Sequence, residues 1–281
     1  MHITQEMIDL YDRYTHSGGI SRRELVQRLG GGAALAMIAA RADAVAMVSA
    51  DDPRIEAAPR QITLPDGRRM LGYGALPKTG ADTAPRVLVI HENRGLNEHT
   101  KDVARRFAAA GVVAYAADFL SAAGGTPADE DEARDLIGQL DRKATIADGV
   151  AVLDWLGKAV PGKGAACAVG FCWGGGMVND LATAGGSALR VGVAYYGAPA
   201  ADLAAVPNIK ARLVLHYAGL DTRINDMTPA YQAALKAAGI PFESHMYEGV
   251  NHAFNNDTSE ARYNEAAANL AWARTLAALK L

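Results

Sequence analysis

Gly170-Phe171-Cys172-Trp173-Gly174-Gly175 is the stretch that decides the fold of this chain. The apolar run at 165–169 just before it predicts a buried strand, and residues 177–182 just after it predict a helix. A glycine-flanked reactive residue between a strand and a helix is typical of a nucleophile elbow, whose central residue occupies a strained turn. Side chains at 170, 174 and 175 would collide with the neighbouring strand and helix, and glycine removes those collisions.

Cysteine occupies the centre of this turn, where serine is usual. The turn would lift the Cys172 sulfur to the carboxyl end of the sheet, over a helix N-terminus that favours a thiolate and offers N–H groups to an oxyanion. A non-catalytic interpretation stays open for this segment alone. Cysteines are often simply buried, and glycine-rich turns also bind phosphate or pack tightly.

Strands and helices alternate through the rest of the chain. Residues 51–60 are interpreted as a linker, and Pro65-Asp66-Gly67 predicts a hairpin turn between 61–64 and 70–74. Further strands are predicted at 86–91, 112–117, 165–169, 191–196, 212–217 and 242–247, and helices at 98–110, 130–140, 144–158, 229–238 and 260–279. This alternation predicts an α/β fold with a mostly parallel sheet covered on both faces. We expect one such domain over 51–281 and an extension over 1–50.

Composition argues against nucleic-acid binding, a disulfide and a metal site. The chain has 281 residues, half of them hydrophobic, and a net charge of −3 with no long basic run, so nucleic acid is not expected as a partner. Its two cysteines, Cys167 and Cys172, lie too close across a strand end to form a disulfide without distorting the turn. Neither a CxxC pair nor an HExxH helix occurs, so no metal site is expected.

The N-terminal extension has two interpretations. Ser21-Arg22-Arg23-Glu24-Leu25-Val26 is similar to a twin-arginine export signal, a weakly apolar stretch follows at 29–40, and Ala44-Val45-Ala46 offers a cleavage site. The stretch is too short and alanine-rich for a stable membrane anchor. The sequence therefore favours export to the periplasm. The acidic, polar leader at 1–20 favours the alternative, in which short helices pack on a cytoplasmic protein.

Three loops at the carboxyl ends of predicted strands carry reactive side chains. Cys172 is in the first, Asp221 follows strand 212–217, and His252 follows strand 242–247. Working residues gather at this edge of a parallel sheet, and the order nucleophile, acid, histidine is that of the α/β-hydrolase triad. We therefore predict a triad of Cys172, Asp221 and His252.

Each member of the triad has an alternative. Taken singly, Asp221 could belong to an ordinary turn and His252 to the surface. Asp226 competes for the acid, although its position favours capping the next helix. The other histidines that compete for the base are His91, His99, His216 and His245.

A fourth loop, His91-Glu92-Asn93-Arg94-Gly95-Leu96, follows strand 86–91. In this architecture the corresponding loop gives one oxyanion N–H, and Trp173 would give the other. A carboxylate at Glu92 would raise the pKa of the Cys172 thiol and keep it protonated at rest.

Together, the loop at 91–96, the turn at 170–175, Asp221 and Asn251-His252-Ala253-Phe254 resemble the dienelactone hydrolases (carboxymethylenebutenolidases) over roughly residues 60–281. The form of the 91–96 loop and the long leader resemble a bacterial subgroup known only by a general hydrolase name. The resemblance implies an α/β-hydrolase fold and hydrolysis of an enol-lactone through cysteine. It also implies that Glu92 pairs with the resting thiol until substrate frees the thiolate, and that the N–H groups of Asn93 and Trp173 form the oxyanion hole.

One departure concerns the substrate. The family places arginines that bind the substrate carboxylate after the strand at 112–117 and just past the catalytic histidine. Here those regions read Phe119-Leu120-Ser121-Ala122-Ala123 and Phe254-Asn255-Asn256-Asp257, without arginine. Arg94 or Arg223 could supply the charge instead, and surface ion pairing is the alternative for both.

The sequence thus predicts a hydrolase of an ester or enol-lactone that forms a thioester intermediate, takes a small-molecule substrate and needs no cofactor. A general carboxylesterase or thioesterase with the same triad is the nearest alternative. A non-catalytic binding protein or thiol sensor that uses Cys172 is an alternative from another class. A homodimer stays open, because the sequence does not give the oligomeric state.

Overall fold

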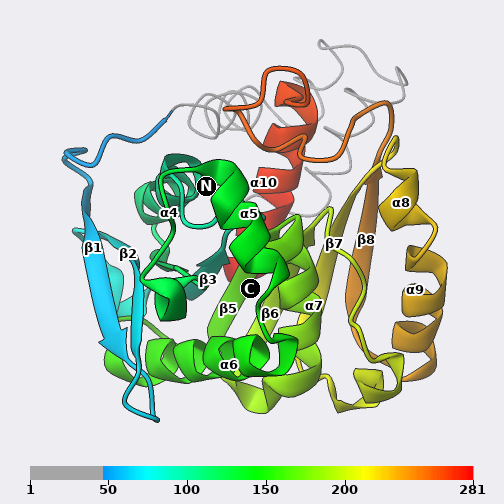
Figure 1. The fold of residues 1–281 in the computed structure, drawn as a ribbon, viewed down its shortest axis with the longest axis horizontal. Coiled ribbons are helices and arrows are strands. Elements are labelled where there is room, and N and C mark those ends of the chain that lie inside the picture. The colour runs from blue at the N-terminus through cyan, green and yellow to red at the C-terminus, as the bar shows by residue number, and fades with distance from the viewer. Residues whose placement is uncertain (1–46, 281) are drawn as a thin grey trace, which may run out of the picture. The chain divides into compact units, whose positions relative to one another are not determined.

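Eight strands form one sheet in the computed structural model, which describes residues 47–280 (Figure 1). They are β1 (Ile55–Thr63), β2 (Arg69–Pro77), β3 (Arg86–Ile90), β4 (Val113–Ala117), β5 (Ala166–Phe171), β6 (Leu189–Tyr195), β7 (Arg212–Ala218) and β8 (Phe242–Tyr247). Their spatial order is β1-β2-β4-β3-β5-β6-β7-β8. Strands β3 to β8 pair in parallel, and only β1 and β2 run antiparallel to their neighbours. The predicted α/β fold with a mostly parallel sheet is confirmed.

The predicted hairpin forms, but it begins earlier than the sequence indicates. Leu64 N–H donates to Arg68 at 2.8 Å across the turn, and Gly67 adopts a φ of 85° that glycine tolerates. Strand β1 already starts at Ile55, so the interpretation of 51–60 as a linker is wrong. Pro59 favoured the interpretation as a linker, because proline is rare inside strands. It is accommodated because β1 lies at the edge of the sheet, where a missing N–H breaks no essential ladder.

Helices connect the parallel strands. They are α4 (Glu98–Ala109), α5 (Glu130–Gly138), α6 (Arg142–Ala159), α7 (Trp173–Ala184), α8 (Thr222–Asn225), α9 (Thr228–Ala237) and α10 (Glu265–Lys280). Asn97, Asp129 and Asp141 begin three of them, each accepting a backbone N–H in the first turn. In the part of the chain that the structure describes, none of the helices has the length and apolarity to cross a membrane.

The core lies on both faces of the sheet. Leu88 and Ile90 of β3 belong to one apolar cluster with residues of α6 and α7, whereas Val87 and Val89, equally buried, point to the opposite face. Helix α4 packs against β2, β3 and β4 (Figure 1). This two-sided burial explains why the strand reads as a continuous apolar run.

The chain divides into two compact units, and residues 48–253 form one of them. It contains the whole sheet and all three predicted triad residues. Residues 254–280, with α10, belong to the other unit. The predicted export signal and its cleavage site lie outside the described residues.

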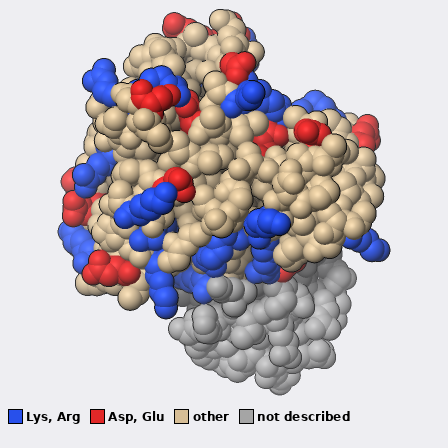
Figure 2. Space-filling model, turned by 90° about the horizontal axis from the view of Figure 1, so that it is seen from below, with Lys and Arg blue, Asp and Glu red and all other residues tan. Residues whose placement is uncertain are grey.

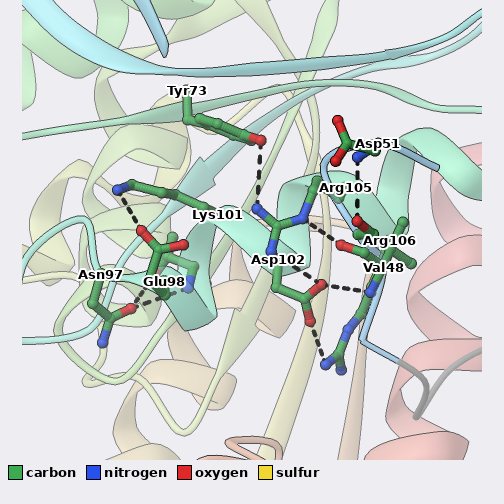
Figure 3. A network of polar contacts seen from close by, with 11 residues as sticks. Val48, Asp51, Tyr73, Asn97, Glu98, Lys101, Asp102, Arg105 and Arg106 are labelled. Atoms are coloured by element: carbon green, nitrogen blue, oxygen red, sulfur yellow. Dashed lines mark hydrogen bonds and ion pairs between the residues drawn. The ribbon is translucent and has the colours of Figure 1, made fainter. Parts of the chain in front are cut away.

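Val48, at the start of the larger unit, is held by charged side chains of α4 (Figure 3). Its N–H donates to Asp102 Oδ1 at 2.8 Å, and its carbonyl accepts from Arg105 Nε at 2.5 Å. Asp102 also pairs with the buried Arg106 at 2.5 Å. Val48 is only 4% exposed, whereas Met47 beside it is 77% exposed. We call Asp102, Arg105 and Arg106 the Val48 clamp.

Candidate active site

Cys172 lies at a sharp turn between β5 and α7. Its backbone has φ 55° and ψ −114°, a conformation that residues with side chains rarely adopt. The turn is held on both sides, because Cys172 N–H donates to Tyr195 at 3.0 Å and its carbonyl accepts from Gly176 N–H at 3.1 Å. The structure thus forms the predicted strand–turn–helix, with α7 starting at Trp173, earlier than its apolar pattern indicates.

The flanking glycines are sterically required. A Cβ atom on Gly170 would lie 2.1 Å from the Gly174 carbonyl oxygen, and one on Gly174 would lie 2.5 Å from that of His91. A Cβ on Gly175 would lie 2.6 Å from the carbonyl oxygen of Tyr195. Because these neighbours are backbone atoms, they cannot move aside without distorting the sheet.

Asp221 and His252 meet at the same edge of the sheet. Asp221 follows β7, and the loop after β8 brings His252 Nδ1 to 2.5 Å from Asp221 Oδ2. Nδ1–H therefore donates to the carboxylate, which fixes the ring and its tautomer. His252 Nε2 is buried, and within residues 47–280 it has no hydrogen-bond partner. This nitrogen can take a proton from a thiol or give one to a leaving group.

The competing residues lie elsewhere. Asp221, not Asp226, caps a helix: it begins α8, while Asp226 follows the end of α8 and Met227 precedes α9. The interpretation of Asp226 as an N-cap is wrong, because the short α8 intervenes. His216 is buried in β7 with its Nδ1 at 2.9 Å from Tyr247 Oη, His245 lies in β8, and His99 is buried in α4.

The surroundings of Cys172 favour the protonated thiol. Burial raises its pKa to about 11, and the Glu92 carboxylate adds to the rise. The N–H groups of Trp173 and Asn93 and the charge of Arg223 oppose the rise. The predicted direction for Glu92 is thus supported, although burial contributes more than the carboxylate. Both cysteines are free.

Tyr196 joins the site, and sequence reasoning missed it. Its hydroxyl donates to Glu92 Oε1 at 3.1 Å, and its ring centroid lies 4.9 Å from that of His252. Its φ of 39° marks a second strained residue, just past β6. Burial and the Glu92 charge hold the pKa of this phenol well above its usual value. A position after a parallel strand was the one available signal.

A cavity of about 550 Å³ opens over Cys172. Three guanidinium groups line it, those of Arg134, Arg142 and Arg223. Arg142 pairs with the buried Asp180 at 2.6 Å. Arg94 is not among the lining residues and instead pairs with Asp131 at 2.7 Å.

Arg223, one of the two predicted substrate-binding arginines, therefore reaches the cavity. Sequence reasoning missed Arg134 and Arg142, because they lie on α5 and α6, away from any strand end. On the face drawn in Figure 2, basic and acidic side chains are interspersed over a mostly uncharged surface.

Comparison with known proteins gives consistent matches. The sequence model of the dienelactone hydrolase family matches residues 70–281. A protein of Salmonella typhi named as a proposed carboxymethylenebutenolidase is 31% identical over 246 residues, covering 78% of this chain and 90% of its own length.

Solved structures agree with that match. The crystal structure of a proposed dienelactone hydrolase from Klebsiella pneumoniae superimposes with a TM-score of 0.73 at 28% identity, covering 80% of this chain and 98% of its own. A dienelactone hydrolase-like promiscuous phosphotriesterase from metagenomic libraries has a TM-score of 0.69 at 22% identity, with coverage of 80% and 98%. At that identity the second likeness concerns the fold alone.

Proposed function

Because the chain belongs to the dienelactone hydrolase family and is an ester or lactone hydrolase with the α/β-hydrolase fold, we propose that Cys172 is its nucleophile, with His252 as base and Asp221 as the orienting acid. One observation carries the proposal. The His252–Asp221 hydrogen bond and the strained Cys172 turn occupy the same edge of the sheet, as a triad requires.

The reaction would run through a thioester. The Cys172 thiol gives its proton to His252 Nε2, and the thiolate attacks the ester carbonyl carbon. The oxyanion accepts hydrogen bonds from the N–H groups of Asn93 and Trp173, each worth about 3 kcal/mol. As the tetrahedral intermediate collapses, the C–O bond breaks and His252 protonates the leaving oxygen. His252 then deprotonates water, which attacks the thioester, and the carboxylic acid leaves as Cys172 regains its proton.

Glu92 would regulate the nucleophile. In the resting enzyme its negative charge disfavours the thiolate, and Tyr196 holds the carboxylate in place. Substrate entering the cavity would disturb this arrangement and free the thiolate. Such a device protects the sulfur from oxidation between turnovers, since the thiolate is the oxidisable form.

The substrate class we favour is an anionic ester or enol-lactone. Arg223 lines the cavity, and its charge acts on Cys172, so it could hold a carboxylate close to the reacting carbonyl. Arg94 is a weaker candidate because Asp131 already pairs with it.

Steady-state hydrolysis of a dienelactone and of an aryl acetate tests this proposal. We expect the full chain to prefer the dienelactone, Cys172→Ala to lose turnover of both, and Arg223→Leu to lose mainly turnover of the anionic lactone. Cys167→Ala is the matched control, since the other free cysteine is buried in β5 and should be dispensable.

Trapping the acyl-enzyme distinguishes the alternatives. Mass spectrometry of the quenched reaction should find the acyl group on the peptide that contains Cys172. Equal turnover of both esters would favour a general carboxylesterase. Peroxide-dependent sulfenylation of Cys172 without ester turnover would favour the thiol sensor.

We also propose export to the periplasm, on the twin-arginine pattern at 21–26 and the small residues at 44–46. Cell fractionation should find a shortened protein starting at Met47 in the periplasm. Replacing Arg22 and Arg23 together by lysine should leave the uncut protein in the cytoplasm. Full-length protein in the cytoplasm of wild-type cells would contradict export.

A further inference from the structure

We infer that His91 is a positioning residue that fixes both main-chain donors of the oxyanion hole. This inference rests on the hydrolase function proposed above. The sequence offered His91 only as a competitor for the general base. The contacts of its ring give it a different role.

Both ring nitrogens of His91 are used inside the protein. Nδ1 lies 2.6 Å from the carbonyl oxygen of Glu92, and Nε2 accepts the N–H of Phe119 at 3.3 Å. These partners require a neutral ring with its proton on Nδ1, because a carbonyl can only accept and an N–H can only donate. The ring is fully buried, which lowers its pKa and favours the same neutral form. His91 therefore has no lone pair to offer a thiol.

The hydrogen bond from Nδ1–H holds the first oxyanion donor. The Glu92 carbonyl and the Asn93 N–H belong to one peptide group, which is planar, so its C=O and N–H point in opposite directions. Fixing the carbonyl toward His91 turns the Asn93 N–H away from it. That N–H acts on the Cys172 sulfur, next to the place where the carbonyl oxygen of the substrate would become an oxyanion. A rotation of this peptide would remove the donor from the site.

The flat face of the same ring holds the second donor. The imidazole stacks on the Trp173 indole, with centroids 5.2 Å apart and planes at 10°. Phe119 packs edgewise against both rings, with centroids at 5.8 Å and 5.6 Å. Trp173 is the first residue of α7, so this stack fixes the helix end whose N–H faces the sulfur. One side chain thus contacts the carbonyl of the first peptide of the hole and the indole of the residue that supplies the second donor.

Two substitutions separate these contacts. His91→Phe keeps a flat ring but leaves the Glu92 carbonyl and the Phe119 N–H without their partner. His91→Gln keeps a neutral donor and acceptor but loses the stack. We expect His91→Phe to lower kcat for an aryl acetate about 10- to 100-fold with little change in KM, because the donors matter in the transition state. His91→Gln should recover part of that loss.

A thionoester comparison distinguishes positioning from general damage. Sulfur accepts hydrogen bonds weakly, so a misaligned hole should slow the oxygen ester more than the matching thionoester. We expect kcat/KM for the oxygen ester, divided by kcat/KM for the thionoester, to be lower in His91→Phe than in the wild type. His245→Gln, a histidine substitution in β8, is the control and should keep the wild-type ratio. An unchanged ratio in His91→Phe and His91→Gln would overturn the inference.

A second measurement needs no turnover. Because the Asn93 and Trp173 N–H groups lower the pKa of Cys172, loosening them should move the alkylation profile of Cys172 to higher pH. An unmoved profile in both His91 variants overturns the inference whatever the substrate. Loss of the hydrolase proposal would look different, since wild-type protein would then turn over neither ester.

Discussion

At the scale of single residues, the resting state of the site depends on the Cys172 thiol, whose surroundings disfavour its ionised form. Cys172 is partly buried and sits near the Glu92 carboxylate, and both raise the pKa of its thiol. The N–H groups of Trp173 and Asn93 and the charge of Arg223 act in the opposite direction and favour the thiolate. The turn thus places the Cys172 sulfur for attack, while burial and the Glu92 charge disfavour the reactive thiolate.

Glu92→Gln should make Cys172 more reactive near neutral pH. Removing the negative charge stabilises the thiolate, so the pKa of Cys172 should fall from about 11 while burial keeps it above an ordinary thiol. The rate of alkylation should then rise at lower pH than in the wild type. Glu98→Gln, at an exposed carboxylate of α4, is the control. Superimposable profiles for Glu92→Gln and wild type would refute the role of the carboxylate.

The sequence located residues whose backbone position follows from local pattern. Cys172, Asp221 and His252 each follow a strand, and parallel strands end at one edge, so the pattern places them together. Tyr196 escaped notice because its role depends on where its side chain points, and Arg142 because it lies on α6, away from any strand end. Periodicity does not carry that information.

At the scale of elements, the turn between β5 and α7 leaves no room for side chains at two of its glycines. Gly170 and Gly174 let the helix start directly against the neighbouring backbone. Element types were predictable here, because buried strands and capped helices have strong patterns. Boundaries were less so, as the late predicted start of α7 and the hidden edge strand β1 show.

Gly174→Ala should destabilise the protein by about 3 kcal/mol or more and abolish turnover. The added methyl would lie 2.5 Å from two carbonyl oxygens, and neither can move freely. Gly176→Ala on the same helix is the matched control, because its nearest neighbour lies at 3.6 Å. It should be neutral or gain up to about 1 kcal/mol from helix propensity. Chemical denaturation measures both, and equal stabilities would contradict the steric argument.

Arg86, at the start of β3, binds the end of α6 and the loop that leads from α6 to β5, and substitutions of it should also destabilise the protein. Its guanidinium donates to five carbonyl oxygens, those of residues 157, 160, 161, 162 and 164, at 2.6–3.2 Å. Arg86→Met should cost about 2–4 kcal/mol, because five partly buried carbonyls lose their donor. Arg86→Lys should cost less, since it keeps the charge and some donors. Thermal unfolding checks the order, and equal losses would argue against the hydrogen bonds.

At the scale of the whole molecule, stability depends on contacts that tie distant parts of the chain together. The Val48 clamp connects the start of the larger unit to α4, 54 residues later in sequence. Sequence alone could not reveal it, because Asp102, Arg105 and Arg106 read as an ordinary charged face of an amphipathic helix.

Asp102→Ala should cost about 3–5 kcal/mol of unfolding free energy. It removes the acceptor for Val48 N–H and leaves the buried Arg106 charge without this partner. Asp154→Ala, at an exposed pair with Lys158, should cost at most about 1 kcal/mol. Denaturant titration compares the two, and similar losses would show that the clamp contributes little.

The same clamp sets where the chain can be cut or extended. Solvent reaches Met47, and one peptide bond later both backbone groups of Val48 are engaged. An affinity tag or surface tether joined directly before Met47 would therefore leave every clamp contact in place. Removing Val48 would leave Asp102 and Arg105 without their backbone partners, so a fusion or cleavage site should be placed before Val48.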